Sequence, residues 1–323
     1  MIGVWLKFII LLILVYIFGS RVTKSSDIIA EKKGWGRAFM GVVFISMVTS
    51  FPELFTGISA ASIVKSPEIS LGQIAGSCIF NLTIIALVQI FFRKNSLFEN
   101  NSKNDLFPLL FSFLLIVLFS SALLISFRVR ILNVGISSLM IFAIYVVFLH
   151  HIFKNRKTGS EEKNYKNEKL SNAVVSFAIS SLIIIAVGFY LPVVGKELAL
   201  KMGWTDSFVG VIFLAFVTSF PELIVSITAA RIGAFEMLLG NIAGSNLFNI
   251  GIVFIIDIFY FSGDIIADIT DSNIFYIGII AAFMNLILFF TLFRGKVVRT
   301  IFKIPLNSIL ILILYILSLG IIY

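Results

Sequence analysis

Two glutamates, Glu53 and Glu222, each lie in the middle of an apolar stretch of membrane-spanning length, inside the same five residues, Thr-Ser-Phe-Pro-Glu. The two stretches, 41–61 and 210–230, are identical at 13 of 21 aligned positions. A carboxylate near the centre of a bilayer is costly, so such a residue is by default a candidate for ion binding. Two of them in a duplicated context predict a symmetric cation site.

A proline precedes each glutamate. Proline inside a helix removes one backbone hydrogen bond and pushes against the carbonyl four residues earlier, so Pro52 should free the carbonyl of Val48 and Pro221 that of Val217. In a bilayer such carbonyls are tolerated only where protein, water or a bound ion satisfies them. We therefore expect a broken helix that presents carbonyl, hydroxyl and carboxylate oxygens together, with Ser46, Thr49 and Glu53 on one face.

A second motif follows each glutamate. Residues 71–81, LGQIAGSCIFN, match residues 239–249, LGNIAGSNLFN, at 8 of 11 positions. Each copy has a serine and an asparagine four residues apart, which project from one helical face: Ser77 and Asn81, and Ser245 and Asn249. The glycines four residues apart allow close helix approach, which would bring these side chains against the broken helices. Hydrogen bonding between helices is the competing role for the serines and asparagines.

The candidate ligands of both motifs are hard oxygen donors. Carboxylates, hydroxyls, asparagine carbonyls and backbone carbonyls suit Ca²⁺, which takes about 6–8 oxygens. Soft ligands are nearly absent, with Cys78 the single cysteine, so zinc and copper are disfavoured. Two glutamate charges neutralise one Ca²⁺, or are matched by several Na⁺ or protons. Competition between different cations for one site is therefore electrostatically feasible.

The composition indicates a polytopic membrane protein. Of 323 residues, 59% are hydrophobic and 13% charged, and the mean hydropathy is +1.07; soluble domains have about 25% charged residues. The net charge of +8 would favour nucleic-acid binding in a soluble protein. Here most basic residues lie in short loops between apolar runs, so the expected partner is the lipid bilayer and not nucleic acid.

Apolar runs of about 20 residues predict ten membrane-spanning helices. They cover 2–19, 36–63, 69–92, 106–127, 131–153, 170–194, 206–230, 236–261, 273–293 and 302–322. The only sizeable polar stretch, 154–169, divides them five and five, so the second half enters the membrane from the opposite side. The predicted fold class is an all-α integral membrane protein with two inverted five-helix repeats, as in many secondary transporters. The halves are 1–153, with the ion motif at 41–81, and 170–323, with the ion motif at 210–249; a short connector, 154–169, joins them.

Basic residues predict the orientation. Nineteen Lys and Arg residues lie in the loops on the same side as the connector 154–169. The opposite side has only Lys65, Arg128, Arg130, Lys196 and Lys201. By the positive-inside rule, both termini lie outside the cell membrane and the connector is cytoplasmic. The outer loop with Asp264, Asp268 and Asp271 could raise the local cation concentration, but a merely solvated loop is the favoured interpretation.

The paired motifs resemble the alpha repeats of the cation/calcium exchanger superfamily, most closely those of compact prokaryotic sodium/calcium exchangers. The resemblance lies in Thr-Ser-x-Pro-Glu followed by Gly-Ser-x-x-Phe-Asn, once in each half. It implies ten helices, ion sites at mid-membrane, and alternating access driven by a sodium or proton gradient. It implicates as ligands Thr49, Ser50, Glu53, Ser77, Asn81, Thr218, Ser219, Glu222, Ser245 and Asn249, with Ser46 and Ala215 at positions whose backbone carbonyls coordinate ions.

The chain departs from the family pattern at three places. Val48 and Val217 replace a common glycine before Thr-Ser, and Cys78, read as a packing residue, replaces a common asparagine. Asn249 stands where many relatives have aspartate, which removes one potential charge or proton site. This last difference argues against potassium co-transport.

The leading interpretation is a secondary active antiporter that exchanges Ca²⁺ for Na⁺ by alternating access. Both ions are its substrates, and no cofactor is expected. Ca²⁺/H⁺ exchange is the nearest alternative, because the same glutamate pair would serve it. A passive channel with a carboxylate-lined pore is a further alternative, which inverted repeats around a mid-membrane site disfavour. An enzyme is not expected, because no span offers a Ser/His, Asp/Asp or His-Glu-His set.

Overall fold

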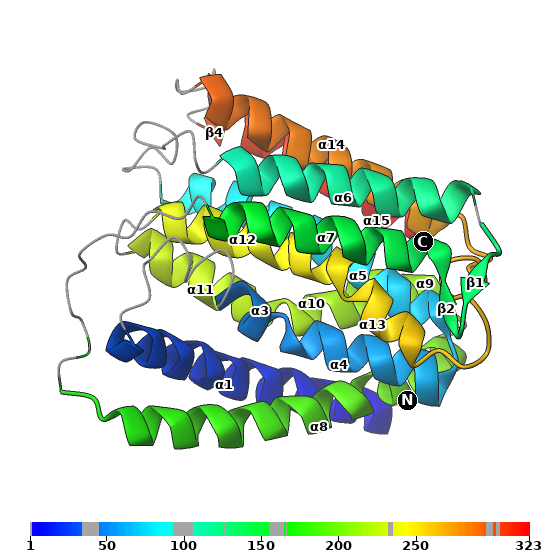
Figure 1. The fold of residues 1–323 in the computed structure, drawn as a ribbon, viewed down its shortest axis with the longest axis horizontal. Coiled ribbons are helices and arrows are strands. Elements are labelled where there is room, and N and C mark those ends of the chain that lie inside the picture. Colours follow the sequence, from blue (N-terminus) through cyan, green and yellow to red (C-terminus); the bar gives the residue numbers. More distant parts are fainter. Residues whose placement is uncertain are drawn as a thin grey trace.

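The computed structural model describes residues 2–33, 45–92, 106–125, 127–154, 165, 167–231, 235–294, 300–301 and 304–323. These parts of the chain are almost entirely helical (Figure 1). Their strands form two short antiparallel pairs. In one, β1 (Arg130–Ile131) pairs with β2 (Val134–Gly135), and in the other β3 (Thr300–Ile301) pairs with β4 (Ile304–Pro305).

Helices occupy each of the ten predicted spans. The first half contains α1 (Ile2–Lys33), α3 (Ser46–Thr49), α4 (Phe51–Ser59), the π-helix η2 (Ala60–Val64), α5 (Pro67–Phe91), α6 (Leu106–Ile125) and α7 (Ile136–Lys154). The second contains α8 (Leu170–Met202), α9 (Asp206–Phe208), the π-helix η4 (Val209–Leu214), α10 (Ala215–Thr218), α11 (Phe220–Arg231), α12 (Phe235–Gly251), α13 (Val253–Ile258), α14 (Asn273–Arg294) and α15 (Leu306–Ile322). The part of the predicted span 36–63 that precedes residue 45 lies outside the described residues.

Six helices in the described chain are long and apolar enough to cross a membrane. They cover Ile2–Lys33, Pro67–Phe91, Leu106–Ile125, Leu170–Met202, Met237–Ile258 and Asn273–Arg294. A seventh crossing is obtained if Asp206–Thr218 and Phe220–Arg231, bent by 46°, count as one broken span. Three shorter apolar helices lie at Phe51–Val64, Ile136–Ile152 and Leu306–Ile322. Helix length and composition thus account for six or seven of the ten predicted crossings.

The two helices that carry the Gly-Ser motif are the most enclosed of the long helices. In the most apolar 18-residue windows, 83% of α5 and 89% of Met237–Ile258 are buried, against 28% in both α1 and α8. Figure 1 shows α1 and α8 together along one edge of the molecule, with α14 and α6 along the opposite edge. Much of the apolar surface of α1 and α8 therefore faces outward, while α5 and α12 carry their polar side chains inside.

Close helix packing at a glycine places α5 against the second half. A Cβ atom on Gly76 would overlap the carbonyl oxygen of Val211 and would lie 2.7 Å from the Val211 Cα atom. Likewise, a Cβ atom on Gly210 would lie only 2.8 Å from the carbonyl oxygen of Ile69. The predicted close approach is confirmed at Gly76, whereas at Gly72, one turn earlier in the pattern, a Cβ atom would make ordinary contact, with its nearest neighbour at 3.4 Å.

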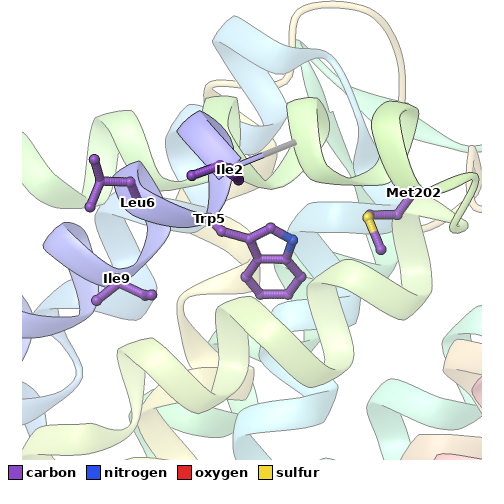
Figure 2. Close-up of a pocket in the computed structure, with 5 residues that line it drawn as sticks. All are labelled: Ile2, Trp5, Leu6, Ile9 and Met202. Atoms are coloured by element: carbon purple, nitrogen blue, oxygen red, sulfur yellow. The ribbon is translucent and has the colours of Figure 1, made fainter.

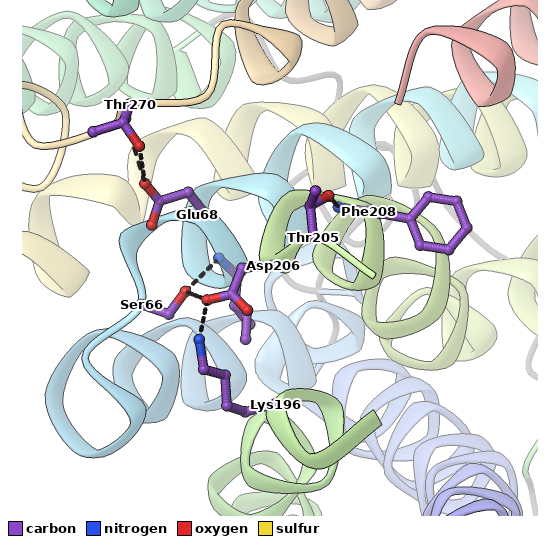
Figure 3. Close-up of polar contacts among 8 residues, drawn as sticks. Ser66, Glu68, Lys196, Thr205, Asp206, Phe208 and Thr270 are labelled. Atoms are coloured by element: carbon purple, nitrogen blue, oxygen red, sulfur yellow. Dashed lines mark hydrogen bonds and ion pairs between the residues drawn. The ribbon is translucent and has the colours of Figure 1, made fainter. Parts of the chain in front are cut away.

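A polar cluster fixes the ends of three helices next to one another (Figure 3). Asp206 Oδ2, in α9, accepts hydrogen bonds at 2.6 Å from Lys196 Nζ of α8 and at 2.6 Å from Ser66 Oγ. Ser66 is also the N-cap of α5, because its hydroxyl accepts from the amide of Ile69 at 3.2 Å. Glu68, in the first turn of α5, accepts from the Thr270 hydroxyl at 3.0 Å. These contacts hold the start of α5 in register with the second half of the chain.

Candidate functional site

Both Thr-Ser-Phe-Pro-Glu sequences interrupt a helix at the serine. α3 ends at Thr49, Ser50 has φ −90° and ψ 14°, and α4 begins at Phe51 with proline in its first turn. In the second copy Ser219, with φ −84° and ψ 11°, separates α10 from α11 in the same way. The predicted break is therefore confirmed in both copies. Helical turns on each side of the break direct the side chains of the motif toward the buried interior.

Each glutamate accepts hydrogen bonds from serines of both halves of the chain. Glu53 Oε1 accepts from Ser219 Oγ at 3.1 Å and from Ser77 Oγ at 3.4 Å. Glu222 Oε1 accepts from Ser50 Oγ at 2.8 Å and from Ser245 Oγ at 3.2 Å. Both glutamates are fully buried, and the Oε2 atom of each has no hydrogen-bond partner among the described residues. One oxygen of each carboxylate is thus available to a cation.

The threonines connect these serines to the backbone at the breaks. Thr49 Oγ1 lies 3.4 Å from Ser245 Oγ, and it donates to the carbonyl oxygen of Ser46 at 3.2 Å. The second copy repeats the arrangement: Thr218 Oγ1 lies 3.4 Å from Ser77 Oγ and 3.3 Å from the carbonyl oxygen of Ala215. All ten of these residues are therefore brought into one buried cluster: Ser46, Thr49, Ser50, Glu53, Ser77, Ala215, Thr218, Ser219, Glu222 and Ser245.

The two asparagines of the motif differ in their surroundings. Asn81 Nδ2 donates to Asn246 Oδ1 at 3.0 Å, so its amide serves in part as the helix–helix contact that was the competing expectation. Asn81 Oδ1 and both polar atoms of Asn249 have no partner among the described residues, although both side chains are fully buried. The structure therefore leaves the Oδ1 atoms of both asparagines without a hydrogen bond.

Asn246 is a fully buried polar residue that contacts Asn81 and was not among the ligands predicted from the sequence. Its Nδ2 atom donates to the carbonyl oxygen of Cys78 at 3.3 Å, while its Oδ1 atom holds Asn81. Asn246 and Cys78 occupy the same position of the two aligned motifs. This mismatch was the available signal, because a polar residue opposite a buried thiol breaks the symmetry of the two copies.

The electrostatics of the cluster favour cation binding. Within the described chain, no three His, Cys, Asp or Glu side chains come together as a metal-binding group. The charge of the site therefore comes from Glu53 and Glu222, and the neutral oxygens complete its coordination shell. Two buried carboxylates without a counter-charge are costly, so the site is stable when cations or protons neutralise them. A hard cation with several oxygen ligands satisfies both the charge and the unpartnered atoms.

The acidic loop that contains Asp264 is more ordered than the sequence suggested. Asp264 is only 4% exposed, and its Oδ1 atom accepts from the amides of Ile266 and Ala267 at 3.1 and 3.2 Å. Burial, reinforced by the nearby Asp257 charge, raises the pKa of the Asp264 carboxyl. Asp257 in turn accepts from the amide of Gly135 at 2.8 Å. The expectation of a solvated loop is wrong for Asp264, because its carboxylate caps a turn.

An apolar pocket of about 430 Å³ lies beside the first turns of α1 (Figure 2). Its lining residues are Ile2, Trp5, Leu6, Ile9 and Met202. None of these side chains carries a charge or an oxygen ligand, so the pocket has no chemistry for a hard cation. The candidate site is instead the buried cluster around the two glutamates.

Comparison with known proteins identifies the family of the chain. The family model described as sodium/calcium exchanger protein matches residues 3–152 and 172–323. An uncharacterized membrane protein of Methanocaldococcus jannaschii is 32% identical over 250 residues, covering 76% of this chain and 78% of the relative. The sodium/calcium exchanger MaX1 of Methanosarcina acetivorans is 25% identical over 264 residues, covering 71% of this chain and 75% of the relative.

Solved structures agree with these sequence matches. The sodium-calcium exchanger NCX_Mj, soaked with 10 mM Na⁺ and zero Ca²⁺, superposes with a TM-score of 0.67 and is 25% identical. The alignment covers 99% of each chain. The same exchanger soaked with 100 mM Na⁺ and 10 mM Sr²⁺ gives the same TM-score of 0.67 and the same coverage. Since the family match takes in nearly all of both halves, the chain belongs to the sodium/calcium exchanger protein family.

Proposed function

We propose that the protein is a secondary active antiporter that exchanges Ca²⁺ for Na⁺ across the cell membrane by alternating access. The observation that carries the proposal is the fully buried pair Glu53 and Glu222, each held by hydroxyls from both halves of the chain. Two carboxylates neutralise one Ca²⁺, and the same charge is matched by Na⁺ ions, so the two cations compete for one set of oxygens. Membership in the exchanger family supports this assignment.

The ion ligands are proposed to be the residues that the paired motifs single out. They are Glu53, Glu222, Thr49, Ser50, Thr218, Ser219, Ser77, Asn81, Ser245 and Asn249, with the backbone carbonyls of Ser46 and Ala215. Support comes from their mutual contacts and from the unpartnered oxygens of both glutamates and both asparagines. Ca²⁺ takes about 6–8 hard oxygen ligands, and this set contains enough hydroxyl, amide and carboxylate oxygens to supply them.

The architecture proposed for this exchanger is ten membrane-spanning helices in two inverted halves, 1–153 and 170–323. The broken helices support it: α3–α4 and α10–α11 run in opposite directions across the molecule (Figure 1). Reciprocal hydrogen bonds between the two breaks are what an approximate two-fold axis between the halves would produce. The excess of basic residues beside the connector 154–169 supports a cytoplasmic connector and external termini.

The decisive experiment is Ca²⁺ uptake by proteoliposomes that contain the purified protein. An imposed Na⁺ gradient should drive Ca²⁺ against its own gradient, whereas a matched pH gradient without Na⁺ should not. Uptake driven only by the pH gradient would instead establish Ca²⁺/H⁺ exchange. Ca²⁺ flux that runs only down its gradient, whatever the Na⁺ or pH gradient, would establish a passive channel.

A further inference from the structure

Four fully buried polar side chains lie beyond the two glutamates and have no hydrogen-bond partner in the described chain. They are Thr56, Gln73, Ser226 and Asn241. Both hydroxyl oxygens are unpartnered, and so are both the nitrogen and the oxygen of each amide. Buried polar groups are nearly always paired in folded proteins, so four such side chains on the helices of one site require an explanation.

In the first half, the spacing of two contacts between α4 and α5 puts Thr56 and Gln73 at the same level along the two helices. Glu53 and Ser77 are in contact at 3.4 Å, and Ser70 Oγ donates to the carbonyl oxygen of Gly57 at 3.0 Å. Along α4, Thr56 lies between Glu53 and Gly57. Along α5, Gln73 lies between Ser70 and Ser77. Both are about one helical turn, or roughly 5 Å, from the level of the Glu53 carboxylate.

The second half repeats this arrangement. Glu222 and Ser245 are in contact at 3.2 Å. Ser226 follows the glutamate by one turn and Asn241 precedes the serine by one turn, so the two lie at the same level. Gln73 and Asn241 occupy the same position of the aligned motifs. Because α4 and α11 run in opposite directions (Figure 1), the two pairs lie on opposite sides of the carboxylates.

Each pair contains a hydroxyl, but the residue that supplies it stands at a different aligned position in each half. Gly57 occupies the position that aligns with Ser226. A Cβ atom there would overlap the Cδ1 atom of Ile256 and would lie 3.1 Å from its Cγ1 atom, so a serine would require the Ile256 side chain to shift. In this half the hydroxyl comes from the preceding residue, Thr56, and it is equally buried and unpartnered.

We propose that Thr56 with Gln73, and Ser226 with Asn241, form two further cation sites in series with the carboxylate pair, one toward each face of the membrane. The proposal rests on the exchanger function proposed above. A hydroxyl and an amide carbonyl are hard oxygen ligands without charge, which bind a Na⁺ or Ca²⁺ ion weakly. Weak binding is what a transit position needs, since an ion that enters must also leave. Gln73 and Asn241 therefore each control how readily ions reach the central site from one face of the membrane.

The test replaces each amide with an apolar side chain of similar size, Gln73→Leu and Asn241→Leu. In proteoliposomes of uniform orientation, the KM for Ca²⁺ is measured separately for ion supplied at either face. Each variant should raise this KM by about tenfold at one face only, and the two variants should do so at opposite faces. Thr83→Val is the matched control on α5, because that buried hydroxyl already donates to the Ile79 carbonyl at 2.9 Å.

Thermal unfolding gives a readout that does not depend on transport. Because the Gln73 and Asn241 amides have no protein partner, the leucine variants should unfold at the same temperature as wild type or higher. A lower unfolding temperature, with KM changed equally at both faces, would show a structural role and overturn the proposal. So would unchanged KM values at both faces in a wild-type background that exchanges Ca²⁺ for Na⁺.

A second variant covers the case in which a leucine variant is not produced in folded form. Gln73→Glu adds a charge at the transit position, which should lower the KM at the same single face and slow turnover, because the ion leaves less readily. Equal changes at both faces, or none, would overturn the proposal with this variant too. If wild-type protein shows no Na⁺-driven Ca²⁺ uptake at all, it is the exchanger function that fails.

Discussion

Replacing one glutamate of the buried pair by glutamine removes half of the charge that neutralises Ca²⁺. In Glu53→Gln the amide oxygen can still accept hydrogen bonds from Ser77 and Ser219, so the shape of the site is retained. A bound Ca²⁺ would then keep one uncompensated positive charge in a fully buried position. The same reasoning applies to Glu222→Gln, whose partners are Ser50 and Ser245.

The size of the effect follows from the burial of the pair. Breaking a buried ion pair by removing one partner costs about 3–5 kcal/mol. Since about 1.4 kcal/mol corresponds to a tenfold change in affinity, Ca²⁺ binding should weaken by about two to three and a half orders of magnitude. At a Ca²⁺ concentration that saturates the wild-type protein, exchange by either variant should therefore be nearly abolished.

Thermal unfolding with and without Ca²⁺ separates lost binding from lost folding. Ca²⁺ at 100 times its Kd should stabilise wild-type protein by about 2.7 kcal/mol, whereas a variant bound 100-fold more weakly gains only about 0.4 kcal/mol. Glu197→Gln is a matched control, because this glutamate forms an exposed pair with Lys7 at 2.8 Å, and exposed pairs contribute little. A Glu53→Gln protein that keeps both its exchange rate and its Ca²⁺-dependent stabilisation would refute the assignment of Glu53 as a ligand.

Three further predictions concern topology, ion dependence and packing. A cysteine introduced at Ser160 in the connector, outside the described residues, should resist impermeant thiol reagents applied to intact cells lacking Cys78; labelling from outside would reverse the proposed orientation. Asn249→Asp should shift the pH or monovalent-ion dependence of exchange, because the buried extra charge must be compensated; superimposable profiles would place Asn249 outside the ion path. Gly76→Ala should lower the free energy of unfolding by about 1–3 kcal/mol through overlap with Val211, while Gly320→Ala, with no atom within 4 Å of its added methyl group, should not; equal unfolding temperatures would contradict the packing described here.

Local chemistry made the broken helices predictable. Proline lacks the amide hydrogen that continues a helix, so the interruption beside Pro52 and Pro221 follows from the sequence alone. Much of the buried polar cluster around the two glutamates was equally visible, because side chains that repeat at helical spacing share a face. Helix ends were less predictable, since hydropathy marks the membrane-embedded part of a helix rather than its end. α1 continues to Lys33 and α8 to Met202, well beyond the apolar runs 2–19 and 170–194.

Contacts between distant segments were beyond the reach of sequence patterns. Ser50 and Glu222 are 172 residues apart, and no local spacing indicates that they meet. The motif mismatch marked Asn246 as unusual, but its partner, Asn81 of the other half, followed from the packing of α5 against α12. Residues 131–135, assigned to a span, instead contain β2 and part of β1, and Gly135 at their end contacts Asp257. In each case a tertiary contact decided a role that the residue type alone left open.

The reciprocal serine bonds bear on how such a protein arose. Glu53 needs Ser219, and Glu222 needs Ser50, so neither half holds a complete carboxylate environment of its own. An ancestor with a single motif could have completed its site only by pairing with a second copy inserted in the opposite direction. Gene fusion would then have fixed that antiparallel dimer as one polypeptide. Two fragments of this chain, severed within 154–169 and produced together, should accordingly restore transport that neither fragment supports alone.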